Sequence, residues 1–123
     1  MSGNKLFLDT NIILYLLDGD ETLAKLLHEK QLYISVITEL ELLSFKDITL
    51  KEEKIIREFV TQCKVTHLND VIKQECIRIR KTYGTKLPDS IIMATSLYLD
   101  LPLITSDAEF KKVDEITLIY YKN

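Results

Sequence analysis

Cysteine, glycine, proline and tryptophan are scarce in this chain of 123 residues, which has two Cys, three Gly, two Pro and no Trp. Two cysteines are too few for the disulfide framework of a small secreted domain, and the spacing of Cys63 and Cys76 fits no zinc motif. Three isolated glycines form neither a phosphate-binding loop nor a dinucleotide-binding motif. A reducing cytoplasm is therefore the expected compartment.

Long hydrophobic runs are also missing. The longest uninterrupted apolar stretch, from Ile12 to Leu17, is far too short to span a bilayer, and the residues before Asp9 lack the apolar segment of a signal peptide. We therefore expect a soluble protein without membrane association. An excess of basic residues is absent too: 16 Lys and Arg against 19 Asp and Glu give a net charge of −3, which is not typical of a nucleic-acid-binding domain.

The chain does contain enough apolar side chain for a hydrophobic core, with 46% hydrophobic and 28% charged residues. At this length we expect a single domain over residues 1–123. Segments with strand and helix patterns alternate. The predicted strands are 5–8, 32–34, 64–68, 101–105 and 116–121, and the predicted helices are 12–17, 21–30, one from about 35, 49–63, 69–83, 87–99 and a short one from 106. This order predicts an α/β fold, a three-layer α/β/α sandwich around a mostly parallel sheet of about five strands.

Four acidic residues fall at informative places on this scaffold. Asp9 directly follows the first predicted strand, and Asp107 follows the predicted strand that ends at Thr105. Asp89 lies in the first turn of a predicted helix, and Glu41 lies inside a helix within an apolar run. Open α/β sheets place their functional sites at the carboxyl ends of their strands. The four acids are therefore the candidate site residues.

Each acid also has a purely structural interpretation. Asp9 and Asp107 suit helix N-caps, and Asp89 suits the positive end of a helix dipole. Glu41 and Glu39 stand two apart on a helix, so only one of them is expected to point inward. These interpretations give no reason for four acids at one sheet edge, where two carboxylates about 4 Å apart repel by roughly 4 kcal/mol at an effective dielectric of 20. A divalent cation provides such a reason.

Two other classes that place an acid after a strand fit less well. A haloacid dehalogenase phosphatase needs a second acid two residues after the first, and Asn11 occupies that position. A response-regulator receiver needs an acidic pair at the first strand and a strand that ends in Lys, and the segment 101–107 has no Lys.

Four ordered segments resemble the motifs of PIN-domain ribonucleases, and within them the small VapC-like toxins of type II toxin–antitoxin pairs. The segments are FLDTN (7–11), ISVITELELL (34–43), KLPDSIIMATSL (86–97) and LPLITSDAEFKKV (101–113). The second motif of that family usually ends in a small or aromatic residue and Gly, whereas this chain continues with Ser44, Phe45 and Lys46. This departure concerns the following loop and none of the four acids.

The resemblance implies a PIN-like fold and Mg²⁺- or Mn²⁺-dependent cleavage of RNA phosphodiester bonds. It assigns Asp9, Glu41, Asp89 and Asp107 both to metal binding and to catalysis. Hard divalent cations prefer such oxygen ligands. The resemblance also implies an antitoxin partner whose C-terminal segment covers the active-site groove, and a homodimer. The alternative is a non-catalytic PIN domain that binds a protein or RNA, but such a domain is expected to have lost one or more of the acids.

Weaker expectations concern the neighbours of these acids. Thr10, Asn11, Thr105 and Ser106 are candidates to hydrogen-bond the carboxylates, or are simply turn and cap residues. The densest basic stretch leads into the third motif and either lines an RNA groove or forms a solvated helix face; it contains Arg78, Arg80, Lys81 and Lys86. Without the four acids the net charge changes from −3 to +1, so the rest of the surface is not acidic.

The two histidines, His28 and His67, belong to no nucleophile motif and are expected to be peripheral. The first two predicted helices are unusually rich in apolar residues, so some of these are expected either in the core or in a partner-binding patch. They are Ile12, Ile13, Leu16, Leu17, Leu23, Leu26 and Leu27.

Overall fold

The computed structural model describes residues 3–122, in which five strands alternate with helices. The strands are β1 (Lys5–Leu8), β2 (Gln31–Ser35), β3 (Lys64–Thr66), β4 (Leu103–Thr105) and β5 (Leu118–Tyr120). The α-helices are α1 (Thr10–Leu17), α2 (Glu21–Leu27), α3 (Val36–Leu43), α4 (Leu50–Thr61), α5 (Asp70–Tyr83) and α6 (Leu87–Leu99), and a 3₁₀-helix η1 covers Ala108–Lys112.

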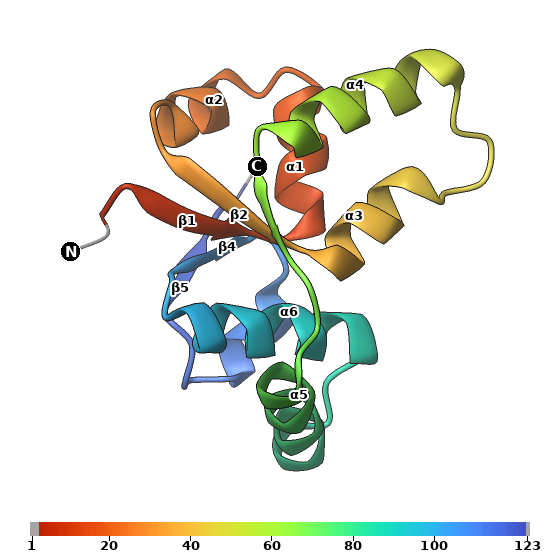
Figure 1. The fold of residues 1–123 in the computed structure, drawn as a ribbon. Helices are drawn as coiled ribbons and strands as arrows, with labels where there is room; N and C mark the ends of the chain where they lie inside the picture. Colours follow the sequence, from red (N-terminus) through yellow and green to blue (C-terminus); the bar gives the residue numbers. More distant parts are fainter. Residues whose placement is uncertain (1–2, 123) are drawn as a thin grey trace.

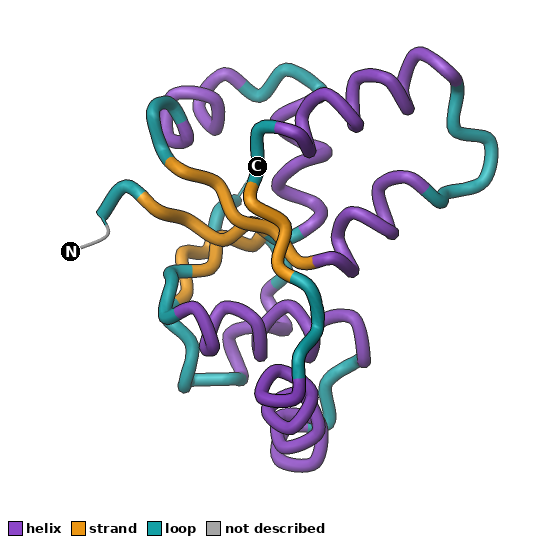
Figure 2. The backbone as a smooth tube through the Cα atoms, viewed as in Figure 1, coloured by secondary structure: helices purple, strands orange, loops and turns teal. Residues whose placement is uncertain are grey.

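The strands form one five-stranded sheet in the order β3-β2-β1-β4-β5, and every pairing in it is parallel. Strand β1 is central, with Phe7 opposite Tyr33 of β2 on one side and Leu103 of β4 on the other. The backbone traces show α1, α2 and α4 on one side of this sheet and α5 and α6 on the other (Figures 1 and 2). The predicted three-layer α/β/α fold is therefore confirmed.

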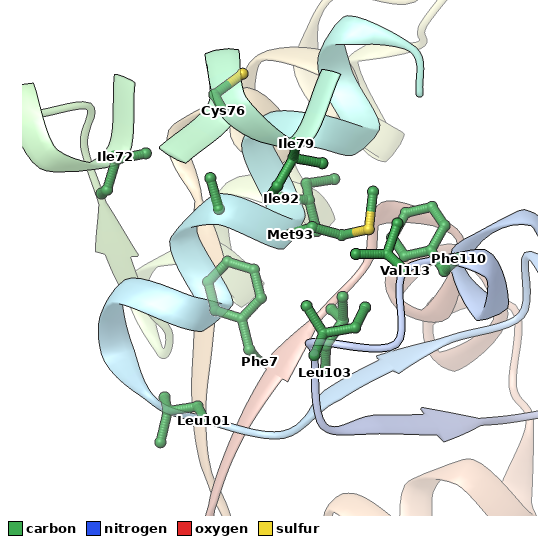
Figure 3. Packing of buried hydrophobic residues seen from close by; sticks show 12 residues of the cluster. Phe7, Ile72, Cys76, Ile79, Ile92, Met93, Leu101, Leu103, Phe110 and Val113 are labelled. Atoms are coloured by element: carbon green, nitrogen blue, oxygen red, sulfur yellow. The ribbon is translucent and has the colours of Figure 1, made fainter. Parts of the chain in front are cut away.

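Alternation along the strands divides the apolar residues between two cores, one on each face of the sheet. Leu6 and Leu8 of β1 pack into the core under α1–α4, whereas Phe7 between them packs into the core under α5, α6 and η1. Figure 3 shows this second core, where Met93 of α6 lies close to Phe110 of η1. Both faces of a parallel sheet are expected to be covered in this way.

Local sequence accounts for several helix ends. Thr49 and Glu52 form a capping box at the start of α4, with each side chain accepting a hydrogen bond from the other residue's backbone N–H. Gly84 ends α5 in the left-handed conformation, with φ of 69°, which glycine adopts without strain. Pro88 lies in the first turn of α6, where its missing N–H leaves no helical bond unmade.

The structure corrects several predicted boundaries. The strand predicted at 101–105 begins only at Leu103, because Pro102 lacks the N–H that pairing would use. The helix predicted at 21–30 ends at Leu27, and Glu29 beyond it has φ of 62°. The short helix predicted after Ser106 is a 3₁₀-helix that begins at Ala108.

The apolar residues of the first two helices are largely core residues. Ile12, Ile13, Leu23 and Leu27 are buried, and of the seven only Leu26 is clearly exposed. No helix within residues 3–122 is long and apolar enough to cross a membrane.

Candidate active site

Asp9 is the most enclosed of the four candidate acids, with an exposed fraction of 6%. It follows β1 and is the N-cap of α1, as the structural interpretation predicted. Its Oδ1 accepts the N–H of Thr10 at 2.8 Å, and its Oδ2 accepts the hydroxyl of Thr105 at 2.6 Å. Burial raises the pKa of Asp9, the two hydrogen bonds lower it, and the charges of Asp107 and Glu41 raise it further.

Glu41 reaches the same region from α3. Its Oε1 accepts the hydroxyl of Thr10 at 2.7 Å, and the Thr10 oxygen lies 3.1 Å from the hydroxyl oxygen of Thr38. Glu39 is placed differently, because it lines a groove between α3 and α4 beside Arg57. Of the two acids on this helix, only Glu41 is thus linked to the segment that carries Asp9.

Asp89 lies in the first turn of α6 and is half-buried. Its pKa is raised to about 6, first by burial and then by the charges of Asp9 and Asp107. The charge of Lys86 opposes this shift and that of Glu41 adds to it. The charges of all three other candidate acids therefore raise the pKa of Asp89.

Asp107 follows β4 and is the N-cap of η1, where its Oδ1 accepts the N–H of Glu109 at 2.9 Å. Its own N–H donates to the hydroxyl oxygen of Thr105 at 3.0 Å. Because Thr105 also donates to Asp9, this one buried hydroxyl connects two of the acids. Asp107 is thus both the N-cap of η1 and a member of the acidic cluster.

The four carboxylates come from segments far apart in the sequence and meet at the carboxyl edge of the sheet. Strands β1 and β4 are hydrogen-bonded neighbours, so Asp9 and Asp107 follow adjacent strands. Thr10 hydrogen-bonds both Asp9 and Glu41, Thr105 hydrogen-bonds both Asp9 and Asp107, and Asp89 lines a pocket together with Asp107. Such a concentration of like charge needs a counter-charge when every group is ionised.

The donor set suits a hard divalent cation, since it consists of carboxylate and hydroxyl oxygens. The side chains are not gathered into a closed site: among the described residues, no three His, Cys, Asp or Glu side chains are arranged to hold a metal ion. Glu41 is exposed and Asp89 and Asp107 are half-buried, whereas Asp9 is enclosed and accepts two hydrogen bonds.

The predicted neighbours of the acids divide into two groups. Thr10 and Thr105 hydrogen-bond the carboxylates, as expected. Ser106 instead approaches the hydroxyl of Tyr15 at 3.4 Å, and Asn11 is exposed. Thr38 was not singled out from the sequence, although its spacing from Ser35 in the second motif was an available signal.

The basic stretch does not act as a unit. Arg78 forms ion pairs with Glu75 and Glu115, and Arg80 donates to the carbonyl oxygen of Thr85 at 3.2 Å. Lys86 is the member whose charge acts on Asp89. His28 and His67 are both exposed, and His28 lies beside Glu29 at 3.3 Å. Neither histidine forms a hydrogen bond or an ion pair with any of the four acids.

Comparison with solved structures agrees with this fold. A toxin–antitoxin complex from Klebsiella pneumoniae contains a chain that is 26% identical, with a TM-score of 0.83 over 96% of this chain and 99% of that one. VapBC-1 from nontypeable Haemophilus influenzae is 25% identical, with a TM-score of 0.72 over 94% and 97%. VapBC2 from Rickettsia felis, bound to a DNA fragment from its promoter, is 18% identical, with a TM-score of 0.81 over 96% and 99%.

No curated protein sequence matches the chain. The family model of the PIN domain matches residues 6–116, which include all four acids and, except for Lys5, strands β1 to β4. The match confirms the resemblance that the four motifs indicated: this chain belongs to the PIN domain family.

Proposed function

We propose that this chain is a Mg²⁺- or Mn²⁺-dependent endoribonuclease and the toxin of a toxin–antitoxin pair. The observation that carries the proposal is the grouping of four acids at the carboxyl edge of the sheet: Thr10 links Asp9 to Glu41, Thr105 links Asp9 to Asp107, and Asp89 lines a pocket with Asp107. Membership of the PIN domain family and the likeness to toxin–antitoxin complexes support it. In the proposal all four acids bind the metal and take part in catalysis.

The chain's own residues would prepare the site. A bound divalent cation would lower the pKa of a water molecule and neutralise charge on the phosphate. Thr105 fixes one oxygen of Asp9, and Thr10 fixes one oxygen of Glu41, so these two carboxylates are oriented before substrate arrives. Burial and the charges of three neighbouring acids raise the pKa of Asp89 to about 6. A cation would favour its ionised form.

An RNA cleavage assay tests the enzymatic part of the proposal. We expect the purified chain to cleave RNA in Mg²⁺ or Mn²⁺ but not in EDTA, and Asp9→Asn and Asp89→Asn each to lower the rate by at least about 100-fold. Asp70→Asn is the matched control for Asp89→Asn, because Asp70 occupies the first turn of α5 on the surface. Wild-type rates in both site variants would refute the assigned roles.

The alternative is a non-catalytic PIN domain that binds RNA or a protein. The same assay separates the two, because a binding module would retain RNA in a mobility assay with Mg²⁺ and leave it intact. The presence of all four acids favours the enzyme.

We further propose an antitoxin and a second copy of the chain as partners, and the cytoplasm as the compartment. The similar structures include a complex of a toxin with an antitoxin. An apolar groove of about 220 Å³ between α1 and α4, which Leu14, Leu17, Phe45 and Ile55 help to line, offers such a partner a surface. Co-purification with the product of the neighbouring gene tests the antitoxin. Light scattering at roughly 100 µM tests the homodimer, because interfaces of standard size bind well below that concentration.

A further inference from the structure

A small pocket of about 120 Å³ opens beside the carboxylates, at the junction of α6 and η1. Both acids and lysines line it, among them Asp89, Asp107, Lys86 and Lys112. The pocket is well below the roughly 300 Å³ at which pockets begin to enclose a whole small molecule. It is therefore suited to one chemical group of a larger ligand.

The two lysines differ in whether they form an ion pair within the described residues. Lys112 is paired with Glu109 at 3.4 Å, and both side chains are substantially exposed. Lys86 has no ion pair within residues 3–122, and its side chain makes no hydrogen bond to any described residue. Its charge is nevertheless close enough to lower the pKa of Asp89. Lys86 is thus a cation at the rim of the carboxylate cluster that remains available to an anion.

The backbone that carries Lys86 is firmly held. Its carbonyl oxygen accepts both the N–H of Ser90 at 2.9 Å and the hydroxyl of Ser90 at 2.7 Å. The buried hydroxyls of Thr85 and Ser90 hydrogen-bond each other, and Arg80 donates to the Thr85 carbonyl. This loop between α5 and α6 (Figure 1) therefore presents the lysine from a fixed position beside the acids.

We infer that Lys86, assisted by Lys112, binds a backbone phosphate of the RNA strand next to the phosphate that is cleaved. This inference rests on the proposed function. Each nucleotide adds one phosphate to the strand, so a neighbouring phosphate must lie near the carboxylate cluster whenever one phosphate lies at it. The guanidinium groups of Arg78 and Arg80 are already bonded, whereas Lys86 lines the pocket beside Asp89 and Asp107. Lys86 is then a substrate-positioning residue.

The acids of the same pocket set a condition on this contact. Asp89, Asp107 and Glu109 outnumber the two lysines, so a phosphate is repelled when no divalent cation offsets their charge. We therefore expect RNA to engage Lys86 only in the presence of a divalent cation. Ca²⁺ is the suitable probe, because we expect it to bind without supporting cleavage.

The experiment measures binding of a short fluorescent single-stranded RNA in Ca²⁺ by anisotropy, as a function of salt. Lys86→Ala should raise the Kd about tenfold and reduce the slope of log affinity against log salt by about 0.7, the value for one phosphate contact on a single strand. Lys86→Arg should restore both. Lys112→Ala should have a smaller effect, because Glu109 shares the charge of Lys112. Lys25→Ala is the control, an exposed lysine on α2.

Lys86→Ala removes no hydrogen bond from the fold, so circular dichroism and the melting temperature should match the parent. In cleavage with Mg²⁺ or Mn²⁺, its KM should rise about tenfold while kcat stays within about twofold. If the parent cleaves RNA but Lys86→Ala keeps the parent's RNA affinity and salt slope, this inference is overturned and the proposed function stands. If the parent cleaves no RNA but Lys86→Ala binds RNA more weakly than the parent, the phosphate contact is supported and the proposed ribonuclease activity is overturned.

Discussion

The two faces of the sheet are covered in different ways. Under α5, α6 and η1, Ile79, Met93 and Phe110 are almost completely buried. On the outside of this layer, Arg78 of α5 forms a two-pronged ion pair with Glu115, at 3.0 and 2.8 Å, and ties the helix to the segment before β5. The interior of this face is closed, although Val71, Ile77, Leu87 and Tyr98 on its outer helices are 46–56% exposed.

The opposite face, under α1–α4, has an equally buried interior and an open exterior. Leu14 of α1, Phe45 after α3 and Ile55 of α4 are 37%, 41% and 42% exposed around the groove between α1 and α4. Isolated exposed apolar residues are common, but a groove lined by several of them is typical of a contact surface. The groove between α1 and α4 is the surface to which the proposal above assigns partner binding.

Phe110→Ala should have the largest effect on stability, because it tests the closed face directly. Removing a fully buried phenylalanine from this core should lower the free energy of unfolding by about 3–5 kcal/mol. Urea titration followed by circular dichroism measures the change. A loss below about 1 kcal/mol would mean that this layer is not the closed core described here.

A divalent cation should stabilise the chain by joining the two layers, since Glu41 lies on α3 and Asp89 on α6. At about 100 times its Kd, Mg²⁺ or Mn²⁺ should add about 2.7 kcal/mol to the free energy of unfolding. Differential scanning calorimetry at pH 7.5 measures this, with Asp89→Asn as the variant that should respond less. If neither ion changes the melting curve and titration calorimetry detects no binding at millimolar concentration, the four acids are not a metal site.

Asp89→Asn should stabilise the metal-free chain at neutral pH. The folded pKa of Asp89 is raised to about 6, so its contribution to stability is complete below about pH 4 and declines as the pH rises through 6. The variant should therefore gain on the parent over this interval and keep a constant advantage above it, of about 1 kcal/mol after solvent screening. Unfolding in EDTA at pH 4, 5, 6 and 7 measures the difference. Asp70→Asn, at a surface position, should show no such gain.

Phe45→Ala should have the smallest effect on stability and completes the comparison with Phe110→Ala. Because Phe45 is 41% exposed, its loss should lower the free energy of unfolding by less than about 1 kcal/mol. Co-purification with the product of the neighbouring gene should nevertheless decrease. Undiminished co-purification in both Phe45→Ala and Ile55→Ala would assign partner binding to another surface.

The sequence determined the fold class because its strand and helix patterns alternate, and only a parallel sheet covered on both faces accommodates that order. It also determined the position of Asp9, since a carboxylate directly after a buried strand has little choice of location. The first and last residues of the strands and helices were predicted less accurately than the fold class. Local patterns extended the strand before Thr105 to Leu101, whereas the strand begins at Leu103, because Pro102 has no N–H to donate to the sheet.

Tertiary structure alone decided which polar neighbours serve the acids and which cations remain available. Thr10 and Thr105 hydrogen-bond the carboxylates while Ser106 approaches Tyr15, and no local pattern distinguishes these hydroxyls. Arg78 is engaged by Glu115, which is 37 residues away, whereas Lys86 makes no ion pair with a described residue. Which hydroxyls and cations find partners depends on contacts between segments far apart in the chain. These contacts exist only after the sheet has brought the segments together, so local sequence patterns do not predict them.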